Sequence, residues 1–445
     1  MLRRRRFYPR KAYPMKIHFR GILAALALPF LAGQALADGC GPASVQTSNA
    51  EQGTPLTLDA AVKRAARAAP EVLLAVLEAR AASADADQAG RRLNPSASIE
   101  TENFAGTGPL RGFSTAENTL VLEQTFRLGG KRRLSERAAR AEAALASARC
   151  EVMRLESQTL AGELFLDLQA AIEIAKVASD AAKLAGEFSD VVSRRVEAGA
   201  SAPPELVRSQ SEEAILQAAA DAAAGEVEAR AIALASVWGR GEVDFVLPDP
   251  AREKFDKAEI KASEGGPSHP RLAEAKAGME ARRAAADLAR AGAWPDVTLS
   301  AGFRNFEQTG DNAFLAGVSV PLPLFDRNQD AARAARLRSQ GAALNANAVE
   351  ASLRAQQASL VARSRTFRSR LDRLEGEALP LAEQAYAAAA EGYRVGKFDL
   401  TATLDARRSL IETRSAVIDA RLSLEIESLR LRALIGAAPF DGDTQ

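Results

Sequence analysis

Side chains that could perform catalytic or metal chemistry are few in this 445-residue chain, which has two histidines and two cysteines. No Cys-x-x-Cys or His-x-x-x-His pair occurs, so the usual spacing of metal ligands is absent from the sequence. His269 stands beside Pro270, a pattern typical of a helix start. Gly129 and Gly130 precede Lys131 without the spacing of a phosphate-binding loop. We therefore predict no enzymatic activity, no cofactor and no metal site.

The first 37 residues are typical of an export signal. Basic residues precede the apolar run GILAALALPFLAG, and the small residues Ala35 and Ala37 form a cleavage site of the usual kind. This run is shorter than the ~18 residues that a membrane-spanning helix needs. Either Met1 or Met15 could be the start of translation. We predict that the mature protein begins at Asp38.

Removal of the signal would change the charge and the redox setting of the chain. The signal holds eight Lys or Arg residues and no acid, so the remainder has 50 basic and 57 acidic side chains, a net charge of −7. No basic stripe is visible, which argues against a nucleic-acid partner. Disulfides persist in exported proteins. Cys40 and Cys150 could therefore form one, Cys40 could instead be acylated, or both could be inert thiols.

The mature chain repeats itself at an offset of about 200 residues, the signature of a repeat architecture. Each half has two prolines that bracket a helical pattern and then a glycine that follows a long helical pattern: Pro70, Pro95 and Gly199, then Pro270, Pro295 and Gly396. We predict a first repeat at 38–239, a linker at 240–268, a second repeat at 269–436 and a tail at 437–445.

Each repeat is predicted to contain a β-hairpin, one very long helix and shorter flanking helices. The hairpins are expected at 96–128 and 296–323, and the long helices at 129–198 and 326–395. At 1.5 Å per residue, each long helix would be about 100 Å long. Pro380 lies inside the second one and predicts a kink. Shorter helices are expected at 70–92, 202–238, 270–292 and 399–435, two beside each long helix.

Apolar and small or polar residues alternate in steps of two within the second hairpin, which predicts strands with unlike faces. This alternation separates apolar Leu299, Phe303, Val318 and Val320 from polar Thr298, Ser300 and Arg304. Four strands from one chain cannot close a barrel, and open sheet edges are excluded in lipid. We therefore predict that three copies build a 12-stranded barrel, with the apolar set facing lipid and the polar set facing a wet lumen.

The chain resembles the TolC-type outer-membrane efflux factors, and within them the heavy-metal (CzcC-like) branch. The resemblance rests on the order of several motifs across most of the mature chain: LNPSASIETENF, LEQTFRLGGKRR, RRVEAGAS, PLPLFDRNQ and YRVGKFDLTATLDARRSL, followed by LIG near the end. It implies a mainly α fold with a small β part. The expected assembly is a homotrimer with a long α-helical periplasmic barrel, a 12-stranded outer-membrane barrel and a belt from segments 58–68 and 240–268.

The resemblance also implies partners and a gate. The periplasmic tip of such proteins docks a membrane-fusion adaptor and an inner-membrane pump of the RND type. Tyr393, Gly396 and Asp405 match the family's tip pattern, together with Gly199 in the first turn. Phe398 stands where the family has a gating arginine, and Ala402 stands where it has a second acidic ring. Asp405 would either form a ring of three carboxylates that attracts cations or be a solvated helix charge.

Two other readings remain open from the sequence. The strands could form a water-soluble hairpin that caps a coiled coil, as in a periplasmic adaptor or scaffold that binds a pump without making a pore. The same channel could also serve multidrug efflux or type I secretion, since a passive duct does not have to recognise its substrate. The scarcity of His, Cys and Met leaves no soft-metal relay to trace, so the assignment of heavy-metal cations rests on the resemblance.

Overall fold

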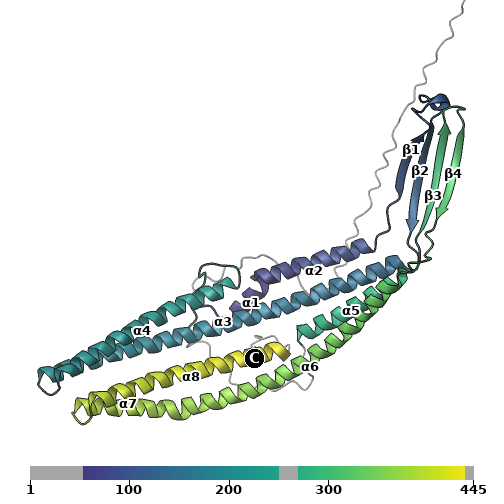
Figure 1. The fold of residues 1–445 in the computed structure, drawn as a ribbon. Coiled ribbons are helices and arrows are strands. Elements are labelled where there is room, and N and C mark those ends of the chain that lie inside the picture. Colours follow the sequence, from purple (N-terminus) through teal and green to yellow (C-terminus); the bar gives the residue numbers. More distant parts are fainter. Residues whose placement is uncertain (1–53, 250–268, 436–445) are drawn as a thin grey trace, which may run out of the picture. The chain divides into compact units, whose positions relative to one another are not determined.

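The computed structural model describes residues 54–249 and 269–435 (Figure 1). The predicted signal, Cys40, most of the predicted linker and the tail lie outside these ranges. The described helices are α1 (Leu58–Ala68), α2 (Pro70–Ala89), α3 (Lys131–Glu197), α4 (Pro203–Ser236), α5 (Pro270–Ala291), α6 (Gln329–Arg373), α7 (Leu379–Arg394) and α8 (Leu400–Ile435). The strands are β1 (Ser96–Glu102), β2 (Glu117–Phe126), β3 (Val297–Phe306) and β4 (Asn312–Ser319).

Two long helical branches, α3 and the α6–α7 run, each carry two shorter helices (Figure 1). α2 and α4 pack along α3, while α5 and α8 pack along α6. α3 also packs against α5 and α8, which joins the two halves of the chain. The side-by-side arrangement that the repeat predicts is therefore present. Abundant alanine allows this close packing, because small side chains let helix axes approach one another.

The second long helix differs from the prediction of one α-helix over 326–395. A π-helical segment, Leu374–Ala378, separates α6 from α7. Pro380 lies two residues after it, in the first turn of α7. A proline in a helix interior removes an N–H and its ring clashes with the carbonyl four residues earlier, which here is that of Gly376, inside the π segment. The local widening of the helix accommodates the proline, as π-bulges do elsewhere.

The four strands form one antiparallel sheet in the order β1-β2-β3-β4. The central pair joins the two hairpins, with Thr125 opposite Thr298 and Leu120 opposite Phe303. The two threonine hydroxyls are 2.9 Å apart. Because the register is in phase across every pair, each face of the sheet carries one set of alternating side chains from end to end.

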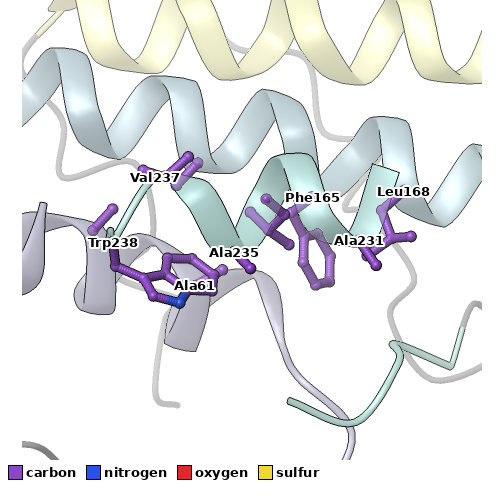
Figure 2. Close-up of a cluster of buried hydrophobic side chains, with 10 residues drawn as sticks. Ala61, Phe165, Leu168, Ala231, Ala235, Val237 and Trp238 are labelled. Atoms are coloured by element: carbon purple, nitrogen blue, oxygen red, sulfur yellow. The ribbon is translucent and has the colours of Figure 1, made fainter. Parts of the chain in front are cut away.

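The main buried cluster lies where α1, α3 and the end of α4 meet (Figure 2). Phe165 and Leu168 of α3 are fully buried against Ala231 and Ala235 of α4, and Trp238 closes the cluster. A second cluster between α2 and α3 is formed by Ala69, Val72, Val76 and Cys150. Cys150 is fully buried there, and its possible disulfide with Cys40 stays a prediction, since Cys40 lies outside the described residues.

Candidate functional site

Two sharp turns, one after α3 and one after α7, build the candidate gate region. Gly199 has φ 68° and Gly396 has φ 77°, a left-handed conformation that side chains with a Cβ rarely adopt. After each glycine the chain closes back on the helix: Ala200 N donates to Arg195 O at 2.7 Å, and Lys397 N donates to Gly392 O at 2.7 Å. These are the bonds of a Schellman-type helix end, and they let each helix pair fold back on itself.

Tyr393 connects the two turns. Its side chain is 2% exposed, and its ring lies 5.1 Å from that of Phe188 on α3. Its hydroxyl donates to Glu205 Oε2 at 2.9 Å, and it lies 3.3 Å from Ser201 Oγ. Burial raises the pKa of the Tyr393 hydroxyl, so the phenol keeps the proton that it donates. The hydroxyl therefore ties the start of α4 to the end of α7.

Arg195 adds a second tie between the same turns. Its guanidinium donates to the carbonyl oxygens of Tyr393 and Arg394, at 3.0 and 3.2 Å, and to that of Ala200 at 3.2 Å. It also lies over the Tyr393 ring, 4.9 Å from the centroid, where a cation is attracted to the aromatic face. The last carbonyls of a helix have no partner inside it: Tyr393 O accepts from Gly396 N at 3.0 Å, and Arg195 adds bonds to Tyr393 O and Arg394 O from the other helix pair.

The other two predicted gate residues, Phe398 and Asp405, lie in the second turn and on α8. Phe398 is 52% exposed and covers Gly392, where an added Cβ would come within 2.2 Å of the Phe398 ring. Asp405 is exposed on α8 and makes no hydrogen bond or ion pair with any described residue. One chain thus brings Tyr393, Gly396 and Gly199 together but leaves Asp405 apart from them. Asp399 accepts from Ala402 N at 2.9 Å and caps α8, as expected for its position.

Sequence reasoning missed Arg195, Glu205 and Ser201 as members of this region. A signal for Glu205 was present, because an acid in the first turn of a helix is a common stabilising position and Glu205 follows the Pro203-Pro204 helix start. Arg195 carried no signal for its contact with the second turn, because the two carbonyls that it bonds there are about 200 residues away along the chain. Phe398 stands where the family resemblance implies an arginine. In this chain the guanidinium of Arg195, on α3, reaches the second turn instead.

The predicted strand residues fall on two unlike faces of the sheet. On one face a row of apolar side chains crosses all four strands: Ile99, Leu120, Phe303 and Phe314. Their exposed fractions run from 39% to 91%, and Leu299 and Val318 pair on the same face. Val320 lies one residue beyond the end of β4, because Pro321 follows it and cannot donate to the ladder; the prediction of Val320 as a strand residue is corrected.

The opposite face is polar and internally paired. Arg304 donates to Glu117 at 2.9 Å, to Glu102 at 3.2 Å and to Thr119 Oγ1 at 2.8 Å. Ser300 and Thr298 lie on the same face as Arg304. This network fixes charged groups from β1, β2 and β3 against one another. Which face meets lipid and which meets water stays a prediction.

His269 has the structural role that its position indicates. Its Nδ1 accepts from Arg271 N at 3.1 Å and caps α5. Burial lowers the pKa of the imidazole, and the positive charge of Arg271 lowers it further.

Among residues 54–249 and 269–435, no group of three His, Cys, Asp or Glu side chains could hold a metal ion. No helix in those ranges is long and apolar enough to cross a membrane.

Comparison with known proteins shows what this chain is similar to. Residues 267–437 match the model of the outer membrane efflux protein family. This part of the chain, which holds the second predicted repeat, is similar to that family. The cobalt-zinc-cadmium resistance protein CzcC of Cupriavidus metallidurans is 29% identical over 373 residues, which cover 82% of this chain and 86% of the relative. The nickel-cobalt-cadmium resistance protein NccC of Alcaligenes xylosoxydans is 28% identical over 270 residues, 60% of this chain and 61% of the relative.

A solved structure has the same fold as this chain. VceC, an outer membrane protein of Vibrio cholerae, superposes with a TM-score of 0.69 at 22% identity, over 85% of this chain and 96% of the other. Such a likeness establishes the fold. It confirms the predicted TolC-like architecture of long helices and a small antiparallel sheet.

Proposed function

We propose that this outer membrane efflux protein is the passive duct of a tripartite heavy-metal efflux system. Three copies would form a barrel of 12 strands in the outer membrane, and their helices would continue the duct through the periplasm. The tip would dock a membrane-fusion adaptor and an inner-membrane RND-type pump. The substrates would be heavy-metal cations, as the names of the relatives CzcC and NccC indicate for those proteins.

The four-stranded sheet is the observation that carries this proposal. Its apolar face is exposed, and β1 and β4 each have one neighbour in the described sheet. In lipid every backbone polar group must be bonded, and an exposed strand edge is a template for another chain. A sheet of this kind therefore fits a membrane only when further copies complete it. The polar face with Arg304 would then line water.

A gene deletion tests the function and the substrate together. We expect cells without this protein to lose tolerance to at least one of Co²⁺, Zn²⁺, Cd²⁺ and Ni²⁺, and to regain it with the wild-type gene. Unchanged metal tolerance with reduced drug tolerance would assign the duct to multidrug efflux instead. Recovery of the protein in the soluble periplasmic fraction would support the adaptor or scaffold reading and would refute the duct.

A further inference from the structure

We call the half of the helices that ends at the Gly199 and Gly396 turns the tip half. Its two outermost helices each have a face that contacts no other described helix. There α4 packs on α3, α3 packs on α8, and α8 packs on α6 and α7. Figure 1 shows α4 and the α6–α7 run as the outermost helices of this row. α4 and α6 therefore each have one face against the protomer and one face against nothing in the described chain. These two helices carry opposite charge: α6 has nine arginines and three acids, whereas α4 has six acids and two arginines.

The basic edge is concentrated at the end of α6. Arg365, Arg370 and Arg373 are exposed, and none makes a hydrogen bond or an ion pair with a described residue. With Thr366 and Ser369 they line one surface hollow. The face of α6 that meets α8 carries Phe367 and Leu371, so the hollow lies on the other side of the helix. We call Arg365, Arg370 and Arg373 the basic edge.

The acidic edge lies on α4. Asp221, Glu226 and Glu228 are exposed, and they flank a face of small exposed residues: Ala214, Ala218, Ala222, Gly225 and Ala229. Asp221 accepts from Gln217, and Glu226 pairs with Arg230, both on α4 itself. Glu228 has no partner among the described residues. We call Asp221, Glu226 and Glu228 the acidic edge. A face of small side chains between charges allows another helix to approach closely.

The two edges stand at the same height above the tip. Arg373, Arg370 and Arg365 lie 23, 26 and 31 residues before Gly396, and Asp221, Glu226 and Glu228 lie 22, 27 and 29 residues after Gly199. Residues at equal counts from Gly199 and Gly396 lie at the same height, as one ion pair between the two halves shows. Arg421 lies 25 residues after Gly396 and Glu173 lies 26 residues before Gly199, and their side chains pair at 3.0 Å.

The other ion pairs show how closely residue counts from Gly199 and Gly396 agree between neighbouring helices. Among those that join different helices of the described tip half, the largest mismatch is five residues, for Arg414 with Glu383. Five residues of helix are about 7.5 Å, which the long arginine side chain spans. In a ring closed by rotation alone, a helix of one copy keeps its height when it meets the next copy.

We propose that the basic edge of one copy binds the acidic edge of the next copy, with Arg365, Arg370 and Arg373 opposite Asp221, Glu226 and Glu228. This inference rests on the proposed trimeric duct and names the surfaces that close it. The contact is head-to-tail, because one partner offers α6 and the other offers α4. Opposite charges also set the register and exclude α4–α4 and α6–α6 pairing, since like charges across an interface repel.

Charge reversal tests the pairing. The triple variant Arg365→Glu, Arg370→Glu, Arg373→Glu should lose the trimer band on native gels of detergent extracts, and Asp221→Lys, Glu226→Lys, Glu228→Lys should lose it too. Glutamate and lysine are good helix formers, so α6 and α4 should persist. Combining all six changes restores opposite charges and should restore the trimer. Trimers that survive both reversals, or a combined variant that stays monomeric, would overturn the pairing.

Cysteine cross-linking tests the register. Thr366 lies 30 residues before Gly396 and Ala229 lies 30 residues after Gly199, and both are exposed. Thr366→Cys with Ala229→Cys should give cross-linked dimers and trimers on oxidation, whereas Thr366→Cys with Ala214→Cys, 15 residues lower on α4, should not. The reverse result would refute this register. A wild type that is monomeric in the outer membrane would refute the trimeric duct itself, whereas intact trimers without the Thr366–Ala229 cross-link would refute only the pairing.

Discussion

Tyr393 and Arg195 show how few atoms hold the two turns together. The phenol hydroxyl contributes one hydrogen bond to a carboxylate, and the guanidinium contributes bonds to two carbonyl oxygens of the second turn. Hydrogen bonds to charged groups contribute about 1.5–3 kcal/mol each. If these two turns close the proposed duct, the binding of a partner could open them, because a micromolar complex has a binding free energy of about 8 kcal/mol.

Removal of the Tyr393 hydroxyl should favour the open gate. Tyr393→Phe keeps the ring against Phe188 and loses the bonds to Glu205 and Ser201. At about 1.5 kcal/mol the closed state would weaken roughly tenfold, and single-channel conductance in planar bilayers should rise. Tyr386→Phe is the matched control, because the Tyr386 hydroxyl on the same helix makes no hydrogen bond with a described residue and interacts with Arg407 through charge alone. Equal conductance in both variants and the wild type would exclude Tyr393 from the gate.

His269 should make the start of α5 sensitive to acid. Burial lowers the pKa of His269 in the fold, so the unfolded segment binds the proton more readily, and stability falls as pH drops below the ordinary value of about 6.5. Protonation also removes the Nδ1 acceptor that caps the helix. Hydrogen exchange at the first turn of α5 should accelerate in the wild type as the pH falls below about 6.5. His269→Asn keeps a capping acceptor without titrating and should not show this acceleration.

Among the elements, the sheet gives the sharpest contrast between neighbouring residues. Leu299→Arg and Val318→Arg each place a charge on the apolar face, which should cost about 2–4 kcal/mol near the bilayer midplane. Ser300→Arg points to the polar face, where Glu123 stands opposite and can pair with it. Heat-modifiable trimers in the outer-membrane fraction should decrease for the first two variants and persist for Ser300→Arg. The same loss in all three would refute the assigned faces.

The sequence predicted the elements whose signal is local and missed those that depend on distant partners. The alternation around Leu299 and Ser300 was sufficient for β3, and the glycines at 199 and 396 were sufficient for the turns, because each of these signals lies within a few residues. The π segment before Pro380 was predicted only as a kink, since the way in which a helix accommodates a proline depends on its neighbours. Arg195 became visible only when α3 and α7 were brought together.

For the whole assembly, Asp405 is the residue to test, since it is exposed and pairs with no residue in the described part of the chain. Three copies around one axis would form a ring of carboxylates, which attracts cations and repels anions. Asp405→Ala should reduce the preference for cations in bilayer recordings, and Asp405→Arg should reverse it at the narrowest point. Both variants should still trimerise, since Asp405 lies outside the strands and both edges. Identical ion selectivity in the three proteins would make Asp405 a solvated helix charge.

The contacts of Arg195 and Tyr393 all lie within a single chain, and this bears on how a three-copy duct would open. When each subunit holds its own two turns together through these contacts, the subunits can open one after another. The pore then has intermediate widths between closed and fully open. Current recordings from trimers that mix wild-type and Tyr393→Phe subunits would then show discrete steps, whose number follows the count of altered subunits. Contacts of this kind between subunits would instead make opening all-or-none.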